Sequence, residues 1–531
     1  MSSPADVRIV VEDGTATVAV SILSRIEGRW RLVASEAAPA AIGVDPIVAE
    51  LVRAVRAADP ELARDLPPPS QAADLPRIVS RGRLAPGAAI LAASERQADV
   101  LAAAARTAGL VVRAPHSAPD LLGAIRAALR PDVAVVVAGS GPRPTSDERG
   151  IADELVAALT SIAARRTDVS FVVAGPLAAR IAAPDVRART TVVDDPAGPE
   201  GGHALREALL EVGLPADDTR RGIANAAREL ALLLELRIEV VEVGHAAGMR
   251  LLAWQAGEGA TSTDARVAVL AEGALVPPDP PDELVDAIAA WSPAVLDRVR
   301  LRDRLVEAYE TPWGDLDGEG ATLTVAAARA AVERMVAATP DISALPAADL
   351  LVACGGAWAD APAPAVALAL VDVARRPGAM QLGFDHARLL GPLGLVADAD
   401  ERRALIAGAI DDIVLPLGTA IVPRGIRASR GTIGHLSLSV DDSISAYIEL
   451  EAGGVHLVDL PPGATGIARL AVRDAVDLGA RGREFEIPVA GGLGGLLVDL
   501  RDVPMRLPSR PDRRREALAA WQRPLWPDAD R

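Results

Sequence analysis

The sequence of 531 residues predicts a multidomain α/β protein with a small β-rich unit at its C-terminal end. Between residues 88 and 175, short Val- and Leu-rich runs alternate with longer Ala-rich, charged segments, as in a mostly parallel sheet covered by helices. Two acidic-glycine turns, at 12–15 and 242–247, each follow a strongly apolar run. After about residue 430, short apolar runs and glycine turns recur without helical segments.

The first unit is expected over residues 1–235 and begins with a hairpin. Strands at 7–11 and 17–23 flank the turn at Glu12 to Thr15, and a strand at 30–34 and a helix at 46–58 follow. The proline-rich stretch 66–76 predicts a loop. An α/β region is inserted at 85–200, with strands at 88–94, 110–114, 133–141 and 169–175 and helices at 95–108, 118–129 and 147–165.

A second unit is expected over residues 236–430, and the β-rich unit over 431–531. Residues 203–236 predict a helix that leads into a strand at 238–243, and 280–338 predict a charged helical region. The segment 349–362 predicts a buried strand that breaks at a Gly-Gly turn before a helix at 363–374. Further strands are expected at 380–384 and 413–417.

Composition excludes several classes of function. The chain contains no Lys, which rules out a P-loop and a Schiff-base pyridoxal-phosphate site. A net charge of −17 argues against a nucleic-acid partner. A single Cys and six scattered His exclude an internal disulfide and argue against a metal cage of His and Cys. With uncharged stretches too short for a membrane span, we expect a soluble, cytoplasmic protein without a membrane partner.

The two acidic-glycine turns and the Gly-Gly turn are the candidate binding elements. Small residues in a hairpin let backbone N–H groups approach a phosphate, and a carboxylate there holds a hydrated Mg²⁺. A plain hairpin turn is the alternative for each copy alone, and His245 has the same alternative. The candidate binding residues are Glu12, Gly14, Thr15, Thr17, Glu242, Gly244, His245, Gly355 and Gly356, with Glu12 and Glu242 as the metal ligands.

In this order, two acidic-Gly hairpins and a strand with a Gly-Gly turn resemble the actin, Hsp70 and sugar-kinase superfamily. That resemblance implies two pseudo-symmetric lobes of ribonuclease H-like type with ATP or ADP and Mg²⁺ clamped between them. Four segments further resemble the glutamate mutase L family (MutL or GlmL), which accompanies adenosylcobalamin-dependent mutases. They are DLLVACGGAWADAP (349–362), MQLGFDHARLLGPLGLVAD (380–398), DIVLPLGTAIVPRG (412–425) and VAGGLGGLLVDLRDVPMRLP (489–508).

The hairpins depart from the pattern of that family. Glu12 and Glu242 stand where the family has Asp, the hydroxyls of the second hairpin are lost, and no Lys stands at or beside Ala19. Glu is one methylene longer than Asp, and a misplacement of about 1 Å costs roughly 10²-fold in rate. We therefore expect a degenerate cleft with at most weak ATPase activity, a pseudo-ATPase.

Three functions follow in order of preference. The resemblance implies a chaperone-like or reactivating partner of an adenosylcobalamin-dependent mutase, with a protein as its partner. A non-enzymatic interaction protein on the same fold, without nucleotide binding, is the first alternative. A small-molecule kinase ranks last, because no general base is evident near the cleft.

Overall fold

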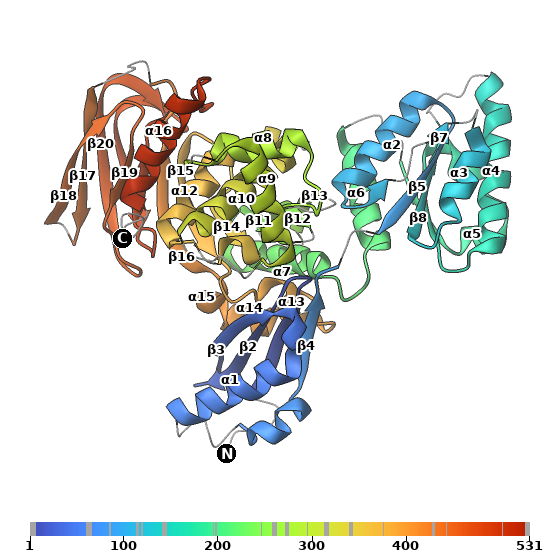
Figure 1. The fold of residues 1–531 in the computed structure, drawn as a ribbon, viewed down its shortest axis with the longest axis horizontal. Helices are drawn as coiled ribbons and strands as arrows, with labels where there is room; N and C mark the ends of the chain where they lie inside the picture. The colour runs from blue at the N-terminus through green and yellow to red at the C-terminus, as the bar shows by residue number, and fades with distance from the viewer. Residues whose placement is uncertain are drawn as a thin grey trace.

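A computed structural model of the chain shows a mixed α/β protein with several sheets (Figure 1). It describes residues 7–525 except 60–65, 84–85, 113–115, 118–119, 141–145, 195, 197–198, 246, 258–262, 271–274, 295, 313–317, 339–342, 360, 375, 427–430, 442 and 502. None of the helices in this described part combines the length and the apolar character that crossing a membrane requires.

The first sheet has the order β3-β2-β1-β4. Strands β1 (Val7–Asp13), β2 (Thr17–Ile26) and β3 (Arg29–Pro39) are antiparallel neighbours, and β4 (Arg77–Arg81) pairs with β1 in parallel. The apolar face of helix α1 (Val44–Ala58) covers this sheet through Ile47, Val48, Leu51, Val52 and Val55. The expected loop at 66–76 contains a short 3-10 helix, Pro69–Asp74, and β4 is a strand that the sequence analysis missed.

The inserted region forms a parallel sheet of its own, as the strand–helix alternation predicted. The order is β10-β9-β8-β5-β6, with β7 also beside β5. Its strands are β5 (Gly87–Ala92), β6 (Val111–Val112), β7 (His116–Ser117), β8 (Val133–Gly139), β9 (Ser170–Ala174) and β10 (Thr190–Val193). Its helices are α2 (Glu95–Thr107), α3 (Leu121–Ala128), α4 (Ser146–Arg165), α5 (Pro184–Arg187) and α6 (Pro199–Gly213). Because α6 packs on β9 and β10, this module continues to residue 213 (Figure 1).

The central sheet has the order β13-β12-β11-β14-β15-β16-β22-β19. Its strands are β11 (Ile238–Val243), β12 (Gly248–Gln255), β13 (Thr263–Leu270), β14 (Leu350–Cys354), β15 (Gly378–Phe384), β16 (Leu415–Val422), β19 (Val455–Val458) and β22 (Leu496–Asp499). Strands β13, β12, β11 and β14 repeat the order and the directions of β3, β2, β1 and β4. Helix α12 (Ala363–Val373) packs on the sheet, and α8 (Asp282–Trp291), α9 (Arg298–Glu310) and α10 (Gly318–Ala338) form the predicted helical region.

Two helices join the first sheet to the central sheet. The predicted helix at 203–236 is interrupted, and its second part is α7 (Thr219–Leu234). Helix α7 packs on β12 and crosses α13 (Leu390–Gly394), which packs on β1 and β4. At the crossing, a Cβ on Gly222 would lie 1.8 Å from the carbonyl oxygen of Gly391, so only glycine permits this approach. The short helices α14 (Ala399–Gly408) and α15 (Ile410–Ile413) follow α13.

The C-terminal segment contributes to two sheets. Strands β17 (Thr432–Val440), β18 (Ser443–Glu451), β20 (Thr465–Asp477) and β21 (Arg481–Ala490) form an antiparallel sheet in the order β18-β17-β20-β21. Strands β19 and β22 instead extend the central sheet beyond β16. Helix α16 (Pro511–Gln522) packs beside α8 (Figure 1). The β-rich segment is therefore continuous with the core of the central sheet.

Candidate functional site

The two acidic-glycine turns have the same backbone geometry. The Gly14 N–H donates to the Thr17 carbonyl oxygen at 3.1 Å, and the Gly244 N–H donates to the Ala247 carbonyl oxygen at 2.9 Å. Each turn joins the first two strands of its sheet, and Glu12 and Glu242 are the penultimate residues of β1 and β11. The two glutamates, 230 residues apart in the chain, thus occupy corresponding places in two sheets.

The parallel fourth strand of each sheet brings a second glycine turn beside the hairpin. Glu12 is opposite Ser80 on β4, and Glu242 is opposite Cys354 on β14. Gly82 follows β4, and its N–H donates to the Asp13 carbonyl oxygen at 2.9 Å. Gly355 follows β14 with a positive φ of 95°, and a Cβ there would lie 2.5 Å from the Val243 carbonyl oxygen. Gly355 therefore supports the second hairpin from behind, and Gly356 reaches the cavity in front of it.

A cavity of about 600 Å³ brings these turns together. Every candidate binding residue except Gly355 lines it, namely Glu12, Gly14, Thr15, Thr17, Glu242, Gly244, His245 and Gly356. Residues of α9 and α10, among them Leu305, Leu323 and Ala327, form an apolar wall. His245 stacks on Tyr309 of α9, with ring centroids 4.8 Å apart, and burial lowers its pKa. The cavity thus combines a polar end at the hairpins with an apolar wall, the usual composition of a small-molecule site.

Burial dominates the electrostatics of the two glutamates. Glu12 is 9% exposed, and burial raises its pKa from 4.5 to about 7, against the nearby positive charge of Arg388. Glu242 is 8% exposed, and its pKa lies well above 4.5 because of burial and then the charge of Glu12. One oxygen of Glu242, Oε2, is buried without a hydrogen-bond partner. Two carboxyl groups line one cavity, and the charge of Glu12 raises the pKa of Glu242, so a cation is favoured there.

Arg388 is a cavity residue that the sequence analysis missed as a site residue. It follows β15 with a φ of 56°, and its Nη1 donates to the Thr17 hydroxyl at 2.7 Å and lies 4.0 Å from Glu12 Oε1. Asp385 precedes it, is 1% exposed, and accepts the N–H groups of Leu389 and Leu390 at the start of α13. The positive charge next to Glu12 therefore comes from a residue on the chain segment between β15 and α13.

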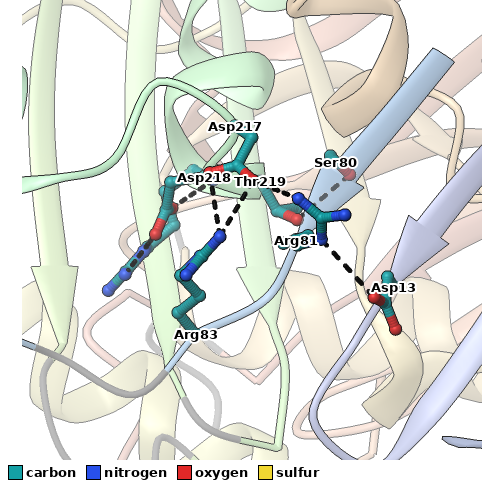
Figure 2. A network of polar contacts seen from close by, with 8 residues as sticks. Asp13, Ser80, Arg81, Arg83, Asp217, Asp218 and Thr219 are labelled. Carbon is teal, nitrogen blue, oxygen red and sulfur yellow. Dashed lines mark hydrogen bonds and ion pairs between the residues drawn. The ribbon is translucent and has the colours of Figure 1, made fainter.

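A buried Asp–Arg ion pair lies at the start of α7. Asp218 and Arg220 are 0% and 3% exposed, and the guanidinium grips the carboxylate through Nε at 2.8 Å and Nη2 at 2.7 Å. Figure 2 shows the polar contacts that connect the end of β4 to the start of α7. Arg81 lies between Asp13 and Asp217, and the Thr219 hydroxyl donates to the Ser80 hydroxyl at 3.1 Å. The end of β4 and the start of α7 are thus held together at the edge of the cavity.

The residues present fit a hydrated Mg²⁺, but not a cation caged entirely by protein. Among the described residues there is no group of three or more His, Cys, Asp or Glu side chains that would hold a metal. Mg²⁺ keeps several waters and takes one or two carboxylates beside substrate phosphates. Glu12 and Glu242 supply two carboxyl groups, and the unpartnered Oε2 of Glu242 is available for such contact.

Position 19, at or beside which the resembled family carries a Lys, lies next to Glu12 in this structure. Ala19 is directly opposite Glu12 in the β1–β2 pair, so the two side chains lie on the same face of the sheet. A longer cationic side chain at position 19 would reach the glutamate from there, whereas in this structure the cationic group beside Glu12 is that of Arg388, 4.0 Å away. Trp358, which follows Gly356, is fully buried in the core and does not line the cavity.

Comparisons with known proteins give only loose likenesses. No protein-family model and no curated protein matches the chain. A nucleotide-free acetone carboxylase structure has a TM-score of 0.30 at 10% identity, over 84% of this chain and 81% of that chain. The activator of 2-hydroxyisocaproyl-CoA dehydratase from Clostridium difficile with bound ADPNP has 0.24 at 10% identity, over 76% and 94%. The PPX-GPPA enzyme of Aquifex aeolicus has 0.20 at 10% identity, over 77% and 92%. At TM-scores this low, function has to be argued from the geometry of the site itself.

Proposed function

We propose that the chain binds ATP or ADP with Mg²⁺ in the cavity between the first sheet and the central sheet. The observation that carries the proposal is the pair of matching hairpins, which place Glu12 and Glu242 on one cavity. In this proposal the two sheets are the pseudo-symmetric, ribonuclease H-like lobes of an actin/Hsp70-like clamp. The shared strand order of the two sheets supports it.

In this proposal, different residues of the cavity contact the phosphates, the metal ion and the nucleoside. The glycines at 14, 244 and 356 leave room for phosphates to approach the backbone. Glu12 and Glu242 would hold Mg²⁺ through its water ligands, and the metal would supply positive charge against the phosphates. The apolar wall of Leu305, Leu323 and Ala327 would pack against the nucleoside.

The same geometry favours weak turnover or none. Each glutamate places its carboxyl group about one bond further from the strand than an aspartate would, and such displacements cost roughly 10²-fold in rate. Burial also raises the pKa of Glu12 to about 7, so this group carries a proton for part of the time near neutral pH. The cleft then binds nucleotide with little or no hydrolysis, as a pseudo-ATPase does.

The partner is proposed from the resemblance in sequence. The glutamate mutase L family implies a chaperone-like, reactivating or assembly role toward an adenosylcobalamin-dependent mutase. Opening and closing of a two-lobed clamp around α7 and α13 would couple nucleotide binding to work on that protein. A non-enzymatic interaction protein without nucleotide binding is the alternative, and a kinase ranks below it because no general base is assigned in the cavity.

Isothermal titration calorimetry with ADP and ATP, with and without Mg²⁺, tests the proposal. We expect binding that strengthens with Mg²⁺ and weakens in Glu242→Gln, whereas Glu36→Gln on the exposed face of β3 serves as the matched control. No binding at millimolar nucleotide would leave the interaction protein as the function. ATP turnover that appears in the double variant Glu12→Asp, Glu242→Asp would show that the site has been retuned.

A further inference from the structure

The guanidinium of Arg220 has one side that nothing in the described structure satisfies. Its Nε and Nη2 are taken up by the two oxygens of Asp218, and its backbone N–H also donates to Asp218 Oδ1 at 2.9 Å. Its Nη1 is buried and has no hydrogen-bond partner, although Arg220 is only 3% exposed and lines the cavity. Buried donors are nearly always paired, so an orphan on a cavity wall indicates a missing acceptor.

The other arginines of the cavity are engaged. Arg388 donates to Thr17 and lies beside Glu12. Arg83, at the cavity mouth, is 44% exposed and pairs with Asp217, and Arg304 pairs with Glu307 on the same helix. Arg220 is therefore the buried arginine of the cavity whose Nη1 can still donate to an anion.

The residues around Arg220 indicate which kind of anion binds there. Arg220 is in the first turn of α7, where the helix dipole favours negative charge, and its ion pair with the capping Asp218 leaves no net negative charge from that pair at this helix end. Glu242 lines the same cavity, and its Oε2 is a second buried polar atom without a partner, an acceptor that a metal-bound water would satisfy. A phosphate would accept from Arg220 Nη1, and a metal ion held at Glu242 would add positive charge against the same phosphate.

We infer that Arg220 is a phosphate-binding residue of the cavity and favours ligands that carry phosphate over ligands that lack it. The inference rests on the proposed nucleotide function and assigns a specific residue to it. Because Arg220 belongs to α7, which crosses α13 through Gly222, a bound phosphate contacts the helix that joins the two sheets.

The test is the variant Arg220→Lys, titrated with ADP, adenosine and inorganic pyrophosphate. Lysine keeps the positive charge beside Asp218 but lacks the second fork of donors. Loss of one charge-assisted hydrogen bond raises the Kd for ADP and pyrophosphate about tenfold to a hundredfold. The Kd for adenosine stays unchanged, and Arg187→Lys, an exposed arginine of α5 that does not line the cavity, serves as the control that leaves all three unchanged.

The outcomes distinguish a failure of this inference from a failure of the proposed nucleotide function. Wild-type binding of ADP that Arg220→Lys leaves unaltered overturns the inference alone. Binding of pyrophosphate without ADP supports the phosphate site and overturns the nucleotide function, and no binding of either ligand overturns both. If Arg220→Lys does not fold, the double variant Asp218→Asn, Arg220→Met removes both charges of the buried pair together and is titrated in its place.

Discussion

Replacement of Glu12 by glutamine should remove a loss of folding stability that the wild-type protein undergoes as the pH rises. Glu12 is buried between the hairpin of the first sheet and Arg388, and burial raises the pKa of its carboxyl group from 4.5 to about 7. A raised pKa means that the folded state binds the proton more tightly than the unfolded state does. The stabilising contribution of this group is therefore complete below pH 4.5 and is lost as the pH rises through about 7.

The size of the effect follows from the shift. Each pKa unit corresponds to about 1.4 kcal/mol, so a shift of this size makes wild type about 3 kcal/mol less stable above pH 7 than at low pH through Glu12 alone. Glutamine at position 12 does not titrate, and it also removes a charge that raises the pKa of Glu242. The stability of Glu12→Gln relative to wild type should therefore increase from pH 4.5 to pH 8.

Urea unfolding at pH 4.5, 6 and 8 measures this difference, with Glu36→Gln as the control for an exposed glutamate of the same sheet, on β3. Because the chain has several modules, hydrogen exchange of the β1 and β2 amides is followed in parallel to localise the change. A difference between Glu12→Gln and wild type that is the same at pH 4.5 and pH 8 would refute the assignment of the titrating group.

The remaining predictions concern the helix crossing, a buried ion network and Arg388. Gly222→Ala places a methyl group 1.8 Å from a carbonyl oxygen of α13, so it should lower the thermal unfolding temperature by the equivalent of about 3 kcal/mol or more, whereas Gly150→Ala on α4 should be neutral or stabilising. Asp372→Asn leaves two buried arginines without their shared carboxylate and should cost about 3–5 kcal/mol in urea unfolding. Arg388→Met removes the charge that lowers the pKa of Glu12, so the midpoint of the pH dependence described above should move upward; an unchanged midpoint would contradict this coupling.

The sequence indicated the hairpins and the Gly-Gly turn because their signals are local. An apolar run that ends in an acidic residue and a glycine predicts a strand and a turn without knowledge of any other segment. Strand β4 was missed because its sequence, RIVSR, is short, begins and ends with arginine, and follows a proline-rich stretch. Its strand identity depends on pairing with β1, which a single-sequence pattern does not contain.

Two other differences have the same origin. The β-rich end of the chain reads as a separate unit, yet β19 and β22 pair with the central sheet, because a strand's neighbours are chosen by long-range packing. Arg220 and Arg388 were passed over as site residues among 55 basic residues, all arginine, because nothing in their local sequence distinguishes them from solvated surface arginines. Burial in the cavity distinguishes them, and burial is a tertiary property.

The sequence by itself determined the α/β character, the inserted parallel module and the glutamates at two glycine turns, because strand and turn preferences act over a few residues. Only the tertiary structure decided that the two turns share a cavity, and that Arg388 meets Thr17 across 371 residues of chain. It also decided the proton affinity of Glu12, since the pKa of a carboxyl group depends on its desolvation and on charges brought close by folding. Local preference therefore produced the parts of the site, and long-range packing at the α7–α13 crossing assembled them.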